Sequence, residues 1–67
     1  MEKAFVKWLK GRLAEEDLTQ RYVADILNVK QQAISYKMKH GAFSLGEAIL
    51  ILRKLKADDA TILKIMR

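Results

Sequence analysis

Apolar residues recur along this chain at helical spacing, and polar or turn-forming residues separate the apolar segments. The first segment has apolar residues at positions i, i+3, i+4 and i+8, which is the pattern of an amphipathic helix. These residues are Phe5, Trp8, Leu9 and Leu13. The acidic residues 15–17 are expected to end this helix. Thr19 predicts a second helix over Gln20–Leu27, because a threonine hydroxyl before a helix accepts a free backbone N–H.

Turn-forming and capping residues divide the rest of the chain. Asn28 and Gly41 tolerate left-handed backbone, so they are expected to end the second helix and a third helix over 31–39. Ser44 and Glu47 have the spacing of a capping box, which predicts a fourth helix that ends near residue 56. Asp58 or Asp59 is expected to cap a short fifth helix.

The residues expected to face the core of these later helices follow the same helical spacing. They are Val23, Ala24, Ile26 and Leu27, then Ile34 and Met38, and then Leu45, Ala48, Ile49, Leu52 and Leu55. The last helix holds Ile62, Leu63, Ile65 and Met66, which is more apolar surface than one side of a small core can cover. No apolar–polar alternation indicates a strand, and no internal repeat occurs. The sequence therefore predicts an all-α fold of five short helices in one domain over residues 1–67.

Composition narrows the class of protein. The chain has 67 residues and no cysteine, which excludes a disulfide framework and a cysteine-bound metal. Its longest apolar run, residues 48–52, is far shorter than the roughly 20 residues of a membrane span. The mixed charges at the start of the chain do not resemble a signal peptide. We therefore expect a soluble intracellular protein that does not bind membranes.

The net charge of +5 lies in the middle of the chain. Positive and negative residues cancel within 1–29 and within 57–67, so the excess falls in 30–56. The cations of this segment are Lys30, Lys37, Lys39, Arg53, Lys54 and Lys56. Such an asymmetry favours a polyanion such as DNA as partner, although a solvated basic face would have the same composition.

The candidate chemistry of the chain does not indicate an enzyme. His40 is the only histidine, and it is expected to contact the last carbonyls of its helix or a phosphate. Asp58 and Asp59 are better explained by a helix start than by acid–base chemistry. No pairing of nucleophile and base, glycine-rich phosphate loop or metal-ligand spacing occurs. We expect no enzymatic activity, no cofactor, no metal and no small-molecule substrate.

Residues 19–39 have the spacing of a helix-turn-helix. The small residue Ala24 is expected where the two helices cross, and Asn28 turns the chain four residues later. Val29 and Ile34 are expected to hold the helix over 31–39 against the helix over 20–27. This packing leaves an outward face on the helix over 31–39, made of Gln31, Gln32, Ser35, Tyr36 and Lys39.

Over residues 18–41 the sequence resembles the Cro/CI family of phage repressors. The resemblance rests on the opening Thr-Gln pair, on Ala24, and above all on residues 29–35, Val-Lys-Gln-Gln-Ala-Ile-Ser. It implies an all-α, lambda-repressor-like DNA-binding domain. The chain departs from the family pattern where Asn28 replaces a glycine, Lys30 a serine, and Lys37 a small or apolar residue.

The resemblance also implies roles for single residues. The position of Gln20 touches a phosphate and braces the recognition helix, and the positions of Gln31 and Gln32 read base edges. The positions of Ser35 and Tyr36 make further contacts in the groove. The chemistry of glutamine agrees with such a role, because its amide matches N6 and N7 of adenine with one donor and one acceptor.

Phosphates and a second copy of the chain are the remaining expected contacts. Lys30, Lys37, Lys39 and the N–H groups near Ser44 are expected to hold DNA phosphates. A weak homodimer is expected through apolar residues of the last helix together with one earlier residue. They are Ile62, Ile65 and Met66, with Phe43.

The expected function is sequence-specific repression of transcription at double-stranded operator DNA, in the cytoplasm of a bacterial host and on its nucleoid. Two alternatives remain open at this point. The chain could be a helical protein-interaction module, such as an antirepressor or an inhibitor, because a fold does not fix a function. It could equally be the DNA-binding domain of a larger regulator.

Overall fold

The computed structural model describes residues 2–66 and contains five α-helices. They are α1 (Glu2–Glu15), α2 (Gln20–Leu27), α3 (Gln31–His40), α4 (Leu45–Lys54) and α5 (Asp59–Met66). The described part of the chain contains no strand, so the expected all-α fold of five helices is confirmed. Over the same residues, no helix is long and apolar enough to cross a membrane.

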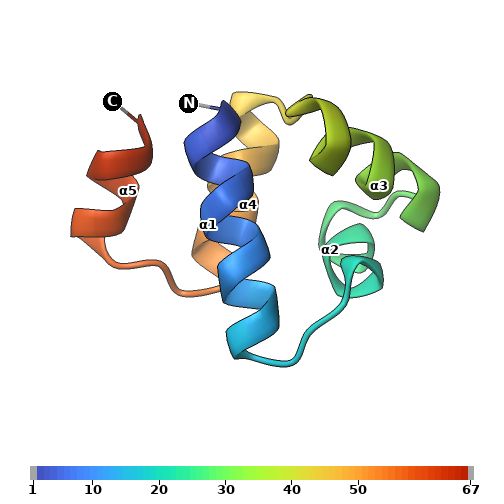
Figure 1. Cartoon of the computed structure of the whole chain (residues 1–67), viewed down its shortest axis with the longest axis horizontal. Coiled ribbons are helices and arrows are strands. Elements are labelled where there is room, and N and C mark those ends of the chain that lie inside the picture. Colours follow the sequence, from blue (N-terminus) through green and yellow to red (C-terminus); the bar gives the residue numbers. More distant parts are fainter. Residues whose placement is uncertain (1, 67) are drawn as a thin grey trace.

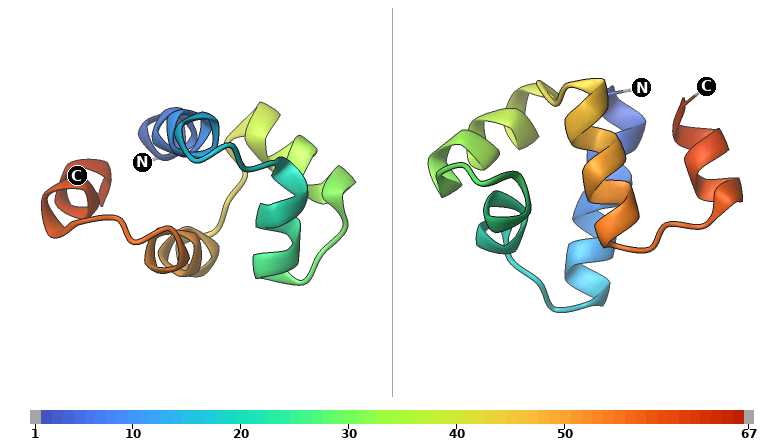
Figure 2. Two further views of the ribbon diagram at one scale, coloured as in Figure 1. Left: turned by 90° about the horizontal axis from the view of Figure 1, so that it is seen from below. Right: turned by 180° about the vertical axis from the view of Figure 1, so that it is seen from behind.

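Helices α1 and α4 run side by side through the centre of the molecule (Figures 1 and 2). Helices α2 and α3 lie on one side of this central pair, and α5 lies on the other side. The beginning of α1 and the end of α5 are therefore at the same end of the molecule (Figure 1). Helix α2 packs against both α3 and α4, which fixes the position of α3 on the central pair.

The core lies between the five helices, and every helix contributes to it. Its largest fully buried side chains are Phe5, Leu9, Val23, Ile34, Ile51 and Leu52. Phe43, in the connection between α3 and α4, packs edge-on against Phe5 with the ring centroids 5.2 Å apart. Burial of each such large apolar side chain contributes roughly 1.5–3 kcal/mol to folding.

The apolar face of α4 differs from the expected one. Leu45 was expected in the core, but the structure leaves this first residue of the helix 52% exposed. Ile49 is only partly buried, whereas Ile51 is fully buried. The physical reason is that residues 48–52 are all apolar, so the sequence leaves the rotation of the helix ambiguous.

Four of the helices end in the same way, with one residue in the left-handed conformation. The next residue then donates its backbone N–H to the carbonyl five positions earlier, over 2.8–3.0 Å. This is the Schellman motif, which satisfies carbonyls at a helix end. The left-handed residues are Asp17, Asn28, Gly41 and Lys56. The expected ends at Asn28 and Gly41 are thus confirmed.

Two of the three expected N-terminal caps are present. Ser44 and Glu47 form the capping box of α4, and Asp58 Oδ1 accepts from the N–H of Thr61 at the start of α5. Hydrogen bonding to the side chain and to the backbone N–H of Thr61 lowers the pKa of Asp58. Thr19 occupies the cap position of α2, but its hydroxyl forms no capping hydrogen bond, so that expectation was wrong. Its backbone carbonyl accepts from the N–H of Tyr22 instead.

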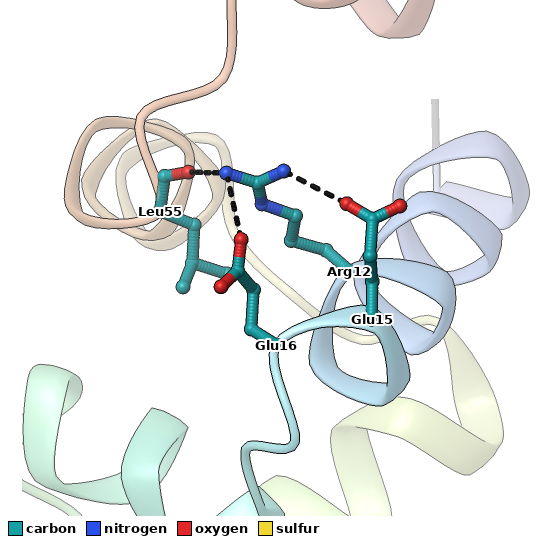
Figure 3. A network of polar contacts seen from close by, with 4 residues as sticks. All are labelled: Arg12, Glu15, Glu16 and Leu55. Atoms are coloured by element: carbon teal, nitrogen blue, oxygen red, sulfur yellow. Dashed lines mark hydrogen bonds and ion pairs between the residues drawn. The ribbon is translucent and has the colours of Figure 1, made fainter.

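Arg12 links α1 to the end of α4 (Figure 3). Its Nη2 donates to the backbone carbonyl of Leu55 over 3.1 Å and lies 3.4 Å from Glu16 Oε1. Its Nη1 donates to Glu15 Oε1 over 3.1 Å. Because Leu55 follows the last turn of α4, this cation also suits the negative end of the helix dipole.

Candidate nucleic-acid interface

Helices α2 and α3 pack closely across a connection of residues 28–30. Ala24 is only 2% exposed, in agreement with a small residue where the helices cross, and Ile34 is fully buried. The carbonyl of Ala24 accepts from the N–H groups of both Asn28 and Val29, which fixes the turn. Val29 was expected to hold α3 against α2, but it remains 37% exposed, so the packing depends mainly on Ile34.

Helix α3 has one buried side and one exposed polar side. Ile34 and Met38 are buried, as expected from their spacing. The five residues expected on the outward face are all exposed: Gln31, Gln32, Ser35, Tyr36 and Lys39. The side chain of Tyr36 is 61% exposed. The structure therefore brings these five residues together on one accessible helix face.

Ser35 and Gln20 connect α3 to the start of α2. The hydroxyl of Ser35 donates to Gln20 Oε1 over 2.7 Å. Gln20 is the first residue of α2, so this hydrogen bond sets the spacing between the two helix surfaces. The amide oxygen of Gln20 is occupied, but its NH₂ group keeps its donors for another partner.

The rings of Tyr36 and His40 lie together near the end of α3. Their centroids are 4.5 Å apart, and the ring planes are inclined by 43°. His40 was expected to contact the last carbonyls of the helix or a phosphate, and in the structure its ring lies against Tyr36. This contact extends the exposed face of α3 to the last residue of the helix.

Lys37 was expected to contact a phosphate, but the structure pairs it with a carboxylate of the chain itself. Its Nζ lies 3.1 Å from Glu47 Oε1, and the two side chains are only 23% and 25% exposed. The hydrogen bond from the backbone N–H of Ser44, followed by that from Lys37, holds the pKa of Glu47 below its ordinary value although partial burial opposes the shift. Lys37 is therefore neutralised inside the protein.

Ser44 was also expected near a phosphate, and the capping box argues against this. Its N–H donates to Glu47 Oε1 over 2.8 Å, and its hydroxyl accepts from the N–H of Glu47 over 3.1 Å. Both groups are already paired, and the carboxylate of Glu47 would repel an approaching anion. The start of α4 is thus occupied by an internal anion.

The remaining cations of residues 30–56 do not form a single patch. Lys30 precedes α3 and Lys39 belongs to its exposed face, and neither takes part in an ion pair among the described side chains. Arg53, Lys54 and Lys56 lie at the other end of α4 from the α3–α4 connection. In the folded chain, the cations of residues 30–56 therefore lie on separate surfaces, although they belong to one segment of the sequence.

The residues expected in a dimer contact do not all lie at the surface. Phe43 and Ile65 are only 6% and 4% exposed, because both pack into the core of the chain itself. Phe43 and Ile65 are therefore core residues and not surface contacts, contrary to the expectation. Ile62 is partly buried against the same core, and Met66 remains 38% exposed. The most exposed apolar residue of α5 is Leu63, at 68%.

Sequence reasoning gave no role to the lysines of α1, because their segment has no net charge. The structure places all three, Lys3, Lys7 and Lys10, along a groove that Lys39 and His40 also line. A signal was present in the sequence, since positions 3, 7 and 10 share one side of a helix. The acidic residues that cancel their charge are spread over the segment 1–29, from Glu2 to Asp25.

The described residues contain no group of three or more histidine or acidic side chains placed to hold a metal ion. The exposed groups of the interface are amides, hydroxyls, aromatic rings and cations.

Comparison of the chain with protein-family models, with curated proteins and with solved structures finds no match.

Proposed function

We propose that this protein is a sequence-specific DNA-binding repressor of the Cro type, which places α3 in the major groove of operator DNA. One observation carries the proposal: α3 has a continuous exposed polar face that begins with two adjacent glutamines, on a helix fixed by Ile34 and by the Ser35–Gln20 hydrogen bond. A rigid helix with free amides at its N-terminal end suits direct readout of base edges.

Gln31 and Gln32 are the proposed base-reading residues. Both are exposed, and neither side chain forms a hydrogen bond with another described side chain or backbone group. Each amide therefore has a donor and an acceptor free for adenine. Tyr36 lies one turn later on the same helix, where its ring suits a thymine methyl group. Ser35 has a different main role, because its hydroxyl hydrogen is used in bracing α3.

Lys30, Lys39 and the NH₂ group of Gln20 are the proposed phosphate contacts beside this face. The two lysines are exposed and unpaired among the described side chains, so their charge is available to DNA. Contacts of this kind position a protein on the duplex without reading its sequence. Repression would follow from occlusion of RNA polymerase at the bound site.

Binding as a two-fold dimer completes the proposal. Leu63 and Met66 are exposed, and Ile62 is partly buried beside them on α5. We assign to these residues a weak contact between two copies that bind adjacent half-sites. Half-sites about 10 base pairs apart would place both copies of α3 on the same side of the duplex.

A protein-interaction module is the second candidate, and the exposure of Leu63 and Leu45 favours it. Large exposed apolar residues are typical of protein contacts, whereas DNA contacts are polar and cationic. The dependence of binding on salt separates the two candidates. Binding to DNA weakens steeply as salt rises, and binding through an apolar helix surface does not.

Selection of binding sites from random duplexes tests the proposal. We expect the enrichment of a sequence that contains adenines at fixed positions, and a binding constant that falls with rising salt. Recovery of no preferred sequence, together with no binding to any duplex at low salt, would reject the DNA-binding function.

A further inference from the structure

A basic groove runs between α1 and the C-terminal end of α3. Its volume is about 460 Å³, and it is lined by Val6 and Met38 together with five basic side chains and Gly41. The basic side chains are Lys3, Lys7, Lys10, Lys39 and His40. No described carboxylate lines it. The groove therefore concentrates cations from two helices that are distant in sequence.

The lysines of α1 repel one another in the isolated protein. Lys3 and Lys7 are separated by four positions and Lys7 and Lys10 by three, so each pair lies on one side of the helix. None of the three takes part in an ion pair among the described side chains. Like charges at these spacings destabilise a helix modestly. An anion bound in the groove would relieve this repulsion.

The groove is continuous with the face of α3 that is proposed to bind DNA. Lys39 belongs to both surfaces, and His40 lines the groove while its ring contacts Tyr36. A helix whose N-terminal residues contact bases has its C-terminal end closer to the rim of the major groove, where the phosphates lie. The position of the groove at the C-terminal end of α3 therefore suits a DNA strand.

We infer that this groove holds a phosphodiester segment of the same duplex that α3 reads. Lys7 and Lys10 would pair with successive phosphates beside those near Lys39. The inference rests on the proposed DNA-binding function and adds α1 to the contact surface. It also gives a role to Lys3, Lys7 and Lys10, which line one groove and share one side of α1.

Charge removal tests the inference against the selected duplex and a random duplex. The double variant Lys7→Gln/Lys10→Gln should bind both duplexes more weakly, and its plot of log affinity against log salt should be less steep by up to about two units. The matched control is Lys64→Gln, which removes a cation from exposed α5 on the other side of the central pair. This control should leave the slope unchanged. Thermal unfolding of each variant verifies that the fold is intact.

Uncharged phosphate analogues distinguish a direct contact from a general effect of charge. A methylphosphonate is placed at one position of the selected duplex at a time, and the affinity is measured for the original protein and for the double variant. We expect one or two adjacent positions at which the substitution weakens the original protein by several-fold and leaves the double variant unaffected.

Two negative results have different meanings. If the original protein binds the duplex but no phosphate position depends on Lys7 and Lys10, the groove is not a phosphodiester site and the proposed function stands. If the original protein binds no duplex, the proposed function fails, and the inference fails with it.

Discussion

The side chains of Lys37 and Glu47 form an ion pair of 3.1 Å that joins α3 to the start of α4. The same carboxylate oxygen accepts from the backbone N–H of Ser44 over 2.8 Å. One oxygen thus fixes the end of α3, the connection that follows, and the first turn of α4. The connection also carries Phe43, whose ring closes the core against Phe5.

Replacement of Glu47 tests the importance of this junction. Glu47→Gln removes the charge that Lys37 and Ser44 share, so we expect a loss of about 1–2 kcal/mol in the free energy of unfolding at neutral pH. The matched control is Glu15→Gln, whose carboxylate is 69% exposed and should contribute little. Denaturant titration of both variants measures the difference. Equal losses in the two variants would contradict the proposed role of the junction.

The same ion pair predicts a dependence of stability on pH. The pKa of Glu47 is lower in the folded chain than its ordinary value of 4.5, so the unfolded chain binds more protons between the two values. The stabilisation is complete above the ordinary value and is lost as the pH falls through the folded value. Denaturant titration across this acidic range should show a smaller loss of stability in Glu47→Gln than in the original protein.

Ala24 tests the close crossing of α2 and α3. Ala24→Leu overfills a site that is only 2% exposed, which should lower the free energy of unfolding by about 1–3 kcal/mol. Ala14→Leu makes the same chemical change on the exposed side of α1 and should have little effect. Identical melting of the two variants would mean that the crossing has room for a larger residue.

Lys56 gives a prediction in the stabilising direction. Its φ of 56° places a residue with a Cβ in the left-handed region, which favours glycine. Lys56→Gly should raise the free energy of unfolding by about 0.5–1 kcal/mol. Lys56→Ala removes the same charge but keeps the Cβ, so it should bring no comparable gain. A loss of stability in Lys56→Gly would disagree with the assigned backbone strain.

Gln32 tests base reading. Gln32→Ala should weaken binding to the selected duplex by about 1–3 kcal/mol and binding to random duplex very little. Lys39→Ala should weaken both by similar amounts, because a phosphate contact does not depend on sequence. Titrations at several salt concentrations compare the two variants. An equal effect of Gln32→Ala on both duplexes would reduce Gln32 to a backbone contact.

Leu63 tests the contact between two copies. Leu63→Lys places a charge on a side chain that is 68% exposed, so the fold should remain intact while the dimer is lost. Sedimentation of the original protein and the variant, free and on a duplex with two half-sites, measures this loss. If both proteins sediment identically in each condition, α5 does not form the contact.

Much of the fold was predictable because the signals are local. The bounds of α2, Gln20–Leu27, agree with the expected ones, since Asn28 favours left-handed backbone and the apolar spacing is clear. Ser44 and Glu47 are separated by only three positions, and their capping box followed from this spacing. Short-range chemistry of this kind is independent of the rest of the fold.

The errors at Lys37 and Phe43 concern contacts between parts of the chain that are separated in sequence. Lys37 meets Glu47 only after α3 and α4 have packed, and Phe43 is buried only because Phe5 lies opposite. When the sequence of α3 is considered alone, Lys37 is one more cation on the surface of the helix. The exposed face of α3 was predictable from the spacing of Ile34 and Met38, whereas the basic groove required the position of α1 relative to α3.

The most direct measurement of the central claim is an NMR titration of the isotope-labelled protein with the selected duplex. The account predicts that the side-chain NH₂ signals of Gln31 and Gln32 shift strongly, together with the backbone amides of α3 and of Gln20. Signals of α5 should change only where two copies meet. Unchanged glutamine side-chain signals, with the largest shifts on α5, would contradict the claim that α3 reads DNA.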